Sequence, residues 1–385
     1  MRTVEIGDFT VGEGHRPRIM GVLNMSVESN YDPSVRGTPT EAKELAEEMA
    51  AQGADIIDIG LQSANPKNDF MPEEIERNRL DAALSVVQNA DVGEAVFSVE
   101  TRFSAIAEEA VAGGFDLVND VCGFADPKMP DVCEDHDVPV VKMASPPDLT
   151  KPGHLRTIDD IFEALQRGGF TDKTIIDPAF GGWYADKTYE DNWEMFRRLR
   201  EFRAFDRPIL TATNREDFLG DIADRPETEN QLAVSLAAAT MEVERGADII
   251  RTHDVPETRD VALVADFLGE PREITESPRV VELTDVSTRE LKRTRTIADS
   301  SVGTVEDGAM RTFKFGSLPS EAEAQLSACV RDSPLYMTRS EAGYLLAGST
   351  AGFSQLLSDI ADGPAQLSEV AGGIRRALTR STDLR

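Results

Sequence analysis

Eight short apolar runs punctuate most of the chain, and a helix-like stretch follows each of them. Each run has the length of a buried parallel strand, and most end in a polar residue that could take part in chemistry. The runs are RIMGVLN (18–24), ADIIDIG (54–60), AVFSVE (95–100), FDLVND (115–120), VPVVKM (138–143), KTIID (173–177), RPILTAT (207–213) and ADIIR (247–251). Eight strand-then-helix units in about 250 residues have the size and rhythm of a (β/α)8 TIM barrel, so the sequence predicts an α/β fold of this architecture.

Polar side chains stand at or just beyond the carboxyl ends of these runs. Active sites of (β/α)8 barrels lie at this end of the strands, where the loops of all eight units meet. We therefore expect a mouth that binds a polar ligand. The residues predicted to line it are Asn24, Ser63, Glu100, Asn119, Lys142, Asp177, Arg215, Arg251 and His253.

The character of the sequence changes near residue 270. We predict a barrel domain over residues 1–270 and a small, mostly helical C-terminal extension of unknown role over residues 271–385. Residues 1–16 look like a short hairpin or strand that plugs the bottom of the barrel, and residues 301–316 look irregular or β. Helices are expected in the extension near residues 286–298, 319–331, 338–348, 351–362 and 366–378.

The net charge of -30 is spread along the whole chain rather than held in an acidic tail. Nucleic acid binds through clustered basic residues, so no nucleic-acid partner is expected for such a surface. An excess of carboxylates with few lysines suits a salt-rich cytoplasm, in which ions screen the self-repulsion. We therefore predict a halophilic protein; the alternative is an ordinary acidic cytosolic enzyme.

The cysteines and the N-terminus bear on location. Cys122, Cys133 and Cys329 have no metal-ligand spacing and cannot all pair, so we interpret them as reduced thiols of a cytoplasmic protein. No apolar stretch approaches the ~20 residues that a membrane span needs. The polar N-terminus shows no signal peptide, so neither a membrane partner nor export is expected.

Five stretches carry a more specific signal. They are IMGVLN (19–24), GADIIDIG (53–60), FDLVNDVCG (115–123), IIDPAFG (175–181) and GADIIRTHDV (246–255). The second and the fifth are so alike that they mark equivalent units of one barrel. In this order and at these spacings, the five resemble the pterin-binding barrel family, and most closely its dihydropteroate synthase branch, over roughly residues 14–268.

The resemblance implies a transferase of folate biosynthesis. Such an enzyme joins a 6-hydroxymethyl-dihydropterin diphosphate to p-aminobenzoate, or a related arylamine, and releases diphosphate with the help of Mg²⁺. Asn24 matches a residue that helps to hold the diphosphate-bound ion, and Asn119 and Asp177 match residues that hold the pterin ring. Arg251 and His253 match residues that contact the diphosphate and together form an anion clamp. The family tends to dimerise, so a homodimer is implied, with these small molecules as the other partners.

The sequence departs from the family pattern at the second and third strands. The loop SANPK (63–67) keeps Ser63 but has Asn65 where the family has an arginine that binds diphosphate. Glu100 stands in SVET where the family has SVDT, so the carboxylate is kept and extended by one methylene. We still expect Ser63 and Glu100 to bind substrate.

Positive charge is also lost after the seventh strand. The family motif SRK is NRE here, so Arg215 remains while Glu216 reverses the charge of a lysine that contacts the pterin. Lys142 replaces a family histidine in the fifth strand, and Lys67 lies two residues beyond Asn65. We predict that Lys142 and Lys67 partly restore the lost positive charge. In the simpler alternatives, Lys142 is only a half-exposed strand-end lysine, and Glu216 pairs with Arg215 or another arginine while the pterin binds differently.

Three other functions remain open at this stage. A pterin-dependent methyltransferase shares the barrel and the pterin pocket, but it needs no diphosphate clamp, so Arg251 and His253 argue against it. A non-catalytic pterin-binding homologue would tolerate the lost arginine and lysine. A barrel that kept its scaffold and changed its substrate is the last alternative, because fold alone does not fix function.

Overall fold

The structure, a computed structural model, describes residues 3–26, 32–63, 68, 70–183, 186–269, 273–276, 279–281, 285–297, 304–331, 333–340, 343–361 and 363–380. It divides into two compact units, residues 1–282 and residues 283–385, and each contains a hydrophobic core. The break falls later than the predicted boundary at residue 270. The difference is the antiparallel pair β11 (Glu273–Glu276) and β12 (Arg279–Val281), which groups with the first unit.

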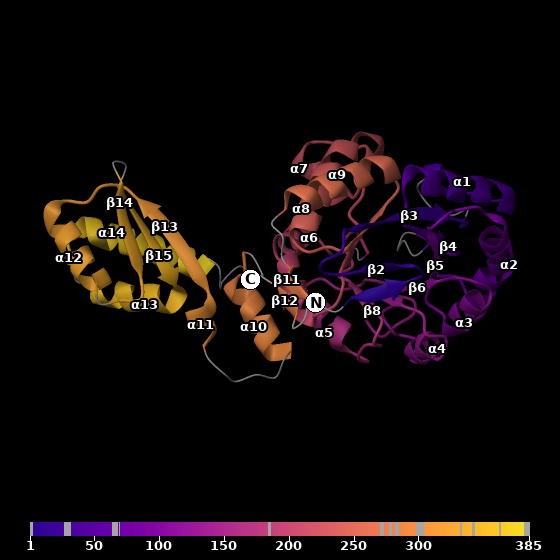
Figure 1. Ribbon diagram of the computed structural model, residues 1–385, viewed down its shortest axis with the longest axis horizontal. Coiled ribbons are helices and arrows are strands. Elements are labelled where there is room, and N and C mark those ends of the chain that lie inside the picture. Colours follow the sequence, from indigo (N-terminus) through magenta and orange to yellow (C-terminus); the bar gives the residue numbers. More distant parts are fainter. Residues whose placement is uncertain are drawn as a thin grey trace. The chain divides into compact units, whose positions relative to one another are not determined.

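Eight parallel strands form the centre of the first unit (Figure 1). They are β3 (Arg18–Asn24), β4 (Ile56–Gly60), β5 (Val96–Thr101), β6 (Leu117–Asp120), β7 (Val140–Met143), β8 (Thr174–Asp177), β9 (Leu210–Thr211) and β10 (Ile249–Thr252). Their order is β8-β7-β6-β5-β4-β3-β10-β9, and a parallel bridge between Ile176 and Ile209 joins β8 to β9. The sheet therefore closes, and the predicted (β/α)8 barrel is confirmed.

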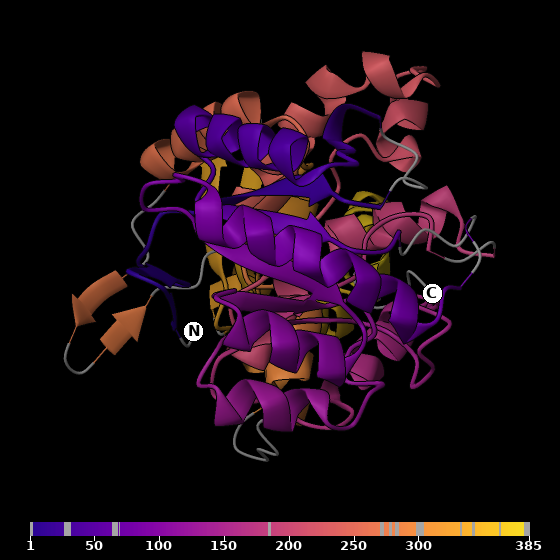
Figure 2. The same cartoon turned by 90° about the vertical axis from the view of Figure 1, so that its right-hand side faces the viewer.

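Helices alternate with the strands and lie outside the ring (Figures 1 and 2). They are α1 (Pro39–Gln52), α2 (Glu73–Asn89), α3 (Ser104–Ala112), α4 (Met129–Asp135), α5 (Ile158–Gln166), α6 (Tyr189–Arg197), α7 (Asp217–Ile222), α8 (Leu232–Glu244) and α9 (Val255–Leu268), with 3-10 turns η1 (Asp32–Ser34), η2 (Leu199–Phe205) and η3 (Thr228–Asn230). Local sequence sets the ends of α1. The Thr38 side chain accepts from the backbone N–H of Glu41, and Gly53 ends the helix in the left-handed conformation.

The side chains of each strand alternate between two cores. Ile57, Phe97 and Val118 point outward and pack against the helices. Their neighbours Ile56 and Val96 point into the barrel. This alternation fixes which later residue of each strand faces the interior, so it decides which polar groups share the mouth.

An N-terminal hairpin fills the opposite end of the barrel, as predicted. The strands β1 (Val4–Ile6) and β2 (Phe9–Val11) pair in antiparallel fashion. Val4, Ile6 and Val11 are buried in the interior core, beside residues near the starts of the barrel strands. The bottom is therefore apolar and filled, which leaves the carboxyl ends of the strands for a polar site.

The second unit joins helices to a three-stranded antiparallel sheet of order β13-β15-β14. Its elements are α10 (Thr288–Ile297), α11 (Val305–Gly308), β13 (Met310–Phe315), α12 (Ser320–Arg331), β14 (Tyr336–Ser340), β15 (Gly343–Ser349), α13 (Thr350–Asp359) and α14 (Ala365–Arg380). Four of the five expected helices are present, as α10, α12, α13 and α14. The helix predicted over residues 338–348 is wrong, because this segment forms β14 and β15.

Two further observations concern the described residues as a whole. Cys122 and Cys133 are buried, Cys329 is half-buried, and all three are free thiols. Within the residues that the structure describes, no helix combines the length and the apolar character that a membrane crossing requires.

Candidate active site

The inward-facing positions of the strands change from apolar to polar toward the carboxyl end of the barrel. On five strands, the residue two positions after the last apolar interior residue is polar. These residues are Asp58, Ser98, Asn119, Asp177 and Arg251. Two residues further toward the mouth lie Gly60, Glu100 and, just beyond β10, His253. Asn24, at the end of β3, is in register with Gly60. Most of the predicted site residues therefore meet in one mouth, because strand alternation carries them to the same side.

Asp58 is the centre of a buried hydrogen-bond network. Its Oδ1 accepts from Ser98 Oγ at 2.7 Å. Its Oδ2 accepts from Asn119 Nδ2 at 3.0 Å and from Arg251 Nε at 2.8 Å. The network links β4, β5, β6 and β10, and it fixes the directions of the Asn119 amide and the Arg251 guanidinium before a ligand arrives.

Arg251 is held between two carboxylates. Besides its bond to Asp58, its Nη2 donates to Glu100 Oε2 at 2.5 Å. Burial raises the pKa of Glu100 to about 7; the charge of Arg251 opposes this rise, and that of Asp58 adds to it. The Glu100 carboxyl can therefore gain or lose a proton near neutral pH, and the guanidinium already shares its charge with two acids.

Asp177 ends β8 inside the barrel and is held by its own turn. Its Oδ1 accepts from the backbone N–H of Ala179 at 2.7 Å, and Ala179 has a positive φ of 60°. Burial raises the pKa of Asp177 to about 6, while this N–H, Arg251 and Lys187 lower it. Asp177 is therefore mainly a carboxylate at pH 7, in a fixed orientation that suits the paired N–H groups of a ligand.

Asn24 ends β3 and lies across Gly60 of the neighbouring strand. Its Nδ2 donates to Ser34 Oγ at 2.9 Å. A Cβ placed on Gly60 would come within 2.9 Å of Asn24 Oδ1, so the absence of a side chain at Gly60 leaves room for this amide oxygen. The Asn24 amide is thus oriented from both sides at the rim of the barrel.

Ser63 lies after β4, and its Oγ accepts from Asn68 Nδ2 at 2.8 Å. The next four residues, which include Asn65 and Lys67, lie outside the described residues. The prediction that Lys67 restores positive charge at the mouth therefore stays a prediction.

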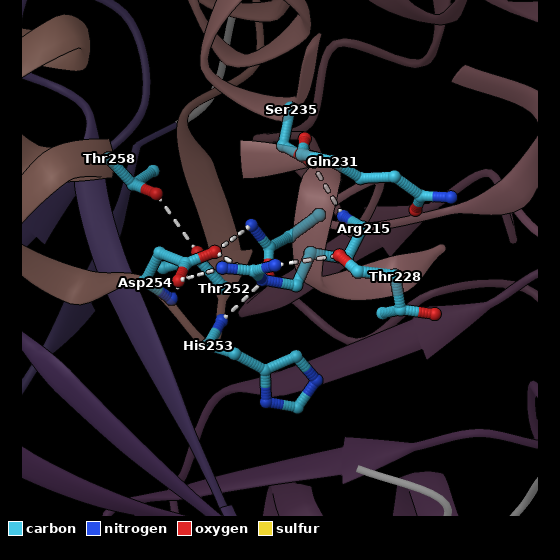
Figure 3. Close-up of polar contacts among 9 residues, drawn as sticks. Arg215, Thr228, Gln231, Ser235, Thr252, His253, Asp254 and Thr258 are labelled. Carbon is cyan, nitrogen blue, oxygen red and sulfur yellow. Dashed lines mark hydrogen bonds and ion pairs between the residues drawn. The ribbon is translucent and has the colours of Figure 1, made fainter. Parts of the chain in front are cut away.

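Arg215 and His253 lie in neighbouring loops that are tied together (Figure 3). Arg215 donates from Nε and Nη2 to the carboxylate of Asp254, both at 2.8 Å, and from Nη1 to Thr228 O at 2.7 Å. Asn214 donates to the same carboxylate at 2.9 Å and accepts from the backbone N–H of His253 at 3.0 Å. Arg215 thus orders the loops after β9 and β10, and its guanidinium charge is matched by Asp254.

The side chain of His253 points away from this loop network (Figure 3). Burial, together with the nearby charge of Arg251, lowers the pKa of His253 to about 3. The imidazole is therefore neutral at pH 7 and offers hydrogen bonds rather than charge. In the predicted anion clamp, the positive charge comes from Arg251 alone.

Lys142 does not reach the mouth, so its predicted role in substrate binding is corrected. It occupies an outward position of β7, and its side chain is fully buried. Its Nζ donates to three carbonyls at and beyond the end of α5, those of Leu165, Arg167 and Gly169, at 2.8, 2.6 and 2.8 Å. Strand alternation turns this lysine away from the interior, and the same three carbonyls satisfy its three protons.

Comparison with known proteins supports the sequence resemblance. The family described as pterin binding enzyme matches residues 20–253. The dihydropteroate synthase of Bacillus subtilis is 33% identical over 256 residues, which cover 65% of this chain and 88% of that enzyme. The chain belongs to the dihydropteroate synthase family.

Solved dihydropteroate synthases share the barrel. The structure from Coxiella burnetii, in complex with pteroic acid, has a TM-score of 0.58 at 30% identity and covers 69% of this chain and 98% of its own. The structure from Thermus thermophilus, in complex with 4-aminobenzoate, has a TM-score of 0.58 at 30% identity and covers 69% and 100%. The resemblance expected from the five motifs is therefore confirmed.

A haloarchaeal relative is much longer. The probable bifunctional folylpolyglutamate synthase/dihydropteroate synthase of Halobacterium salinarum is 33% identical over 266 residues, which cover 66% of this chain. The match spans only 32% of that relative, so the likeness to it is confined to one part of a larger protein.

Sequence reasoning missed two residues of this dihydropteroate synthase barrel. The sequence did contain a signal for Asp58. It is a charged residue within an apolar strand, two positions after Ile56, so it faces the barrel interior on the same side. Lys187 gave no such signal, because it lies in an irregular segment between β8 and α6. Its side chain is nevertheless buried at the turn after β8, where its Nζ donates to Ala179 O at 2.7 Å.

Proposed function

We propose that this chain is a dihydropteroate synthase. It would transfer the pterin methylene of 6-hydroxymethyl-dihydropterin diphosphate to the amine of p-aminobenzoate or a related arylamine. A C–N bond forms, the C–O bond to diphosphate breaks with its electron pair, and the amine gives up a proton. The observation that carries the proposal is the shared mouth of Asn119, Asp177 and Arg251 in a barrel of this family.

The pterin ring would bind deepest in the mouth. Asp177 accepts from the amino and ring N–H groups of the pterin edge, and Asn119, oriented by Asp58, bonds the same ring. Glu100 would hold Arg251 from the other side and balance its charge. These positions are buried, so hydrogen bonds made there are protected from water.

The diphosphate would lie toward the rim. Arg251 supplies the cationic donor and His253 a neutral hydrogen bond. Ser63 adds a hydroxyl, and Arg215 acts by holding the loop that carries His253. We give Ser63, Arg251 and His253 substrate-binding roles on the basis of their place in the mouth and the family resemblance, and Arg215 a positioning role through the loop.

We propose Mg²⁺ as the cofactor, with Asn24 as its protein ligand. Mg²⁺ usually binds through one or two protein oxygens, phosphate oxygens and water. The oriented amide oxygen of Asn24 fits this need, and among the described residues no cluster of three or more acidic, His or Cys side chains is arranged to hold a metal by itself. When bound, the ion would neutralise the charge that develops on the leaving diphosphate.

We also propose the setting in which the enzyme works. The charge of -30 and the free thiols support a cytoplasmic, halophilic protein without nucleic-acid partners, and the family resemblance supports a homodimer. A melting temperature that rises from dilute buffer to molar KCl would support the halophilic assignment, and equal stability in both would refute it. Light scattering in the same buffers would test the dimer.

The decisive experiment measures diphosphate release in high KCl with Mg²⁺, the dihydropterin diphosphate and p-aminobenzoate. Release that requires the arylamine, and that falls in Asp177→Ala and Arg251→Ala, would support a synthase. Asp81→Asn, an exposed substitution on α2, serves as the control. Pterin binding without release for any arylamine would instead favour a non-catalytic pterin binder or a methyltransferase.

A further inference from the structure

Glu76 is a buried acid on the helix that follows the loop of Ser63. It lies on α2, outside the ring of strands, and only 1% of its surface is exposed. A buried carboxylate needs hydrogen-bond donors for its oxygens, because an unpaired buried charge is costly. The donors of Glu76 come from the segments that follow β4 and β5, and both segments border the mouth. Glu76 therefore connects an outer helix to the rim of the site.

The first oxygen of Glu76 holds the end of β5. Its Oε2 accepts from Thr101 Oγ1 at 2.5 Å, and this hydroxyl oxygen accepts in turn from the backbone N–H of Phe103 at 3.2 Å. Strand alternation turns Thr101 away from the mouth, whereas its neighbour Glu100 faces inward and bonds Arg251. The outer side of this strand end is thus fixed by Glu76, and the inner side by the site itself.

The second oxygen of Glu76 holds the base of the loop after β4. Gln62 is only 3% exposed, and both ends of its amide are satisfied when Nε2 donates to Glu76 Oε1 at 3.0 Å and Oε1 accepts from the backbone N–H of Met71 at 2.7 Å. Gln62 lies near the start of this loop and Met71 near its end, so one amide joins the two stems. We call the contacts among Glu76, Gln62 and Met71 the loop clasp.

Two further contacts close the base of the same loop. Arg79 of α2 donates from Nη1 to Leu61 O at 2.7 Å, and Asn68 donates from Nδ2 to Ser63 Oγ at 2.8 Å. Ser63 follows Gln62 directly, so its backbone begins one residue from the loop clasp. The position of the Ser63 hydroxyl at the rim of the mouth is therefore set from α2.

We propose that Glu76 is a positioning residue for the diphosphate half of the substrate. It acts through the loop clasp, which holds Ser63 where its hydroxyl can bind the diphosphate. The pterin ring is assigned to Asn119 and Asp177, which are held by Asp58 and by the turn after β8 instead. Loss of the clasp should therefore weaken binding of the diphosphate and spare the ring. The inference rests on the proposed function, because it assumes this substrate in the mouth.

The test compares two ligands that share the ring, 6-hydroxymethyl-dihydropterin diphosphate and the same dihydropterin without diphosphate. Calorimetric titration of the full chain in high KCl with Mg²⁺, and without an arylamine, measures both dissociation constants. Burial raises the pKa of Glu76 to about 7, and the Thr101 hydroxyl opposes this rise. Titrations at pH 8 therefore keep the carboxylate that both donors of the clasp region require.

In Glu76→Leu we expect the dissociation constant of the diphosphate ligand to rise roughly 10-fold and that of the diphosphate-free ligand to stay unchanged. Gln62→Leu should have the same effect, and the double variant should bind no more weakly than either single variant, because all of them break one clasp. Glu76→Gln should lie between wild type and Glu76→Leu, since its amide oxygen replaces only one of the two carboxylate oxygens. Glu74→Leu, at an exposed glutamate of the same helix, is the matched control and should bind both ligands as the wild type does.

Equal losses for the two ligands in Glu76→Leu would overturn the inference, because Glu76 would then serve the fold of the barrel rather than the diphosphate half of the site. Unchanged affinity for both ligands would overturn it as well, and so would additive effects of Glu76→Leu and Gln62→Leu. If Glu76→Leu does not fold, Glu76→Gln and Gln62→Leu decide by the same comparison of ligands. In all these cases the wild type still binds, and the proposed function stands. A wild type that binds neither ligand would refute the proposed function, and this inference with it.

Discussion

At the scale of single residues, Asp58 positions several side chains of the site, although it lies in the middle of an apolar strand. It accepts from three side chains, one of them the guanidinium of Arg251. We predict that Asp58→Asn weakens pterin binding by about 10- to 100-fold, because a neutral amide cannot accept from all three donors and leaves the half-buried guanidinium of Arg251 less well paired. Titration calorimetry with 6-hydroxymethylpterin would measure this, with Asp81→Asn as control. Unchanged affinity would mean that Asn119 and Arg251 are positioned without Asp58.

Glu100 makes a pH-dependent contribution to stability. Its pKa is raised from an ordinary 4.5 to about 7, chiefly by burial, so between these values the folded state holds a proton that the unfolded chain has released. The folded state then binds more protons, and the free energy of unfolding falls as pH rises through this window. We predict that Glu100→Gln removes on the order of 2 kcal/mol of this fall. Urea unfolding at pH 5 and pH 7.5 would measure it, and parallel pH profiles for variant and wild type would contradict it.

The sequence could predict the site only as far as strand alternation allows. The ends of the apolar runs placed Asn119, Asp177 and Arg251 in one mouth because parallel strands share an edge. The prediction for Lys142 failed because it depended on whether Lys142 or its neighbour in the strand faces the barrel interior. The apolar run VPVVKM alone does not decide which of the two does. The protonation state of His253 was also beyond reach, since burial decides it and burial is a property of the assembled barrel.

At the scale of elements, Lys142 has a structural task. Its buried ammonium joins β7 to the end of α5 through three carbonyls. We predict that Lys142→Met lowers the free energy of unfolding by about 1–3 kcal/mol, because the carbonyls lose a charged donor, and that pterin affinity stays unchanged. Thermal and urea unfolding with calorimetry would check both parts, and Lys128→Met, at an exposed lysine, gives the baseline. A loss of affinity larger than the loss of stability would reinstate Lys142 as a binding residue.

Elements in the second unit show where periodicity misleads. The segment over residues 338–348 is rich in small residues and was expected to be helical, yet Tyr344 and Leu346 are buried while Leu345 and Ala347 are half-buried, which is the alternation of a strand. Gly343, at a φ of 127°, begins β15 where a Cβ would collide with the backbone of Phe315. This segment forms a strand because it pairs with β13 and β14. A short window of sequence around residues 338–348 does not include both partners, so it cannot show this pairing.

At the scale of the whole molecule, two cores predict two unfolding events. Phe353 is fully buried in the core of the second unit, and Phe202 is fully buried in the first, where it stacks on Phe162. We predict that each substitution by alanine costs about 3–5 kcal/mol in its own unit, through lost burial and the cavity left behind. Phe353→Ala should lower one calorimetric transition and leave pterin affinity unchanged, whereas Phe202→Ala should lower the other.

Calorimetry with and without pterin separates these outcomes. A ligand that binds the folded barrel raises only the transition of the unit that holds it, so pterin should shift the transition that Phe202→Ala lowers. If both substitutions lowered a single shared transition, the two units would unfold as one cooperative body. Loss of pterin binding in Phe353→Ala at temperatures where the barrel remains folded would then show that the second unit contributes to the site.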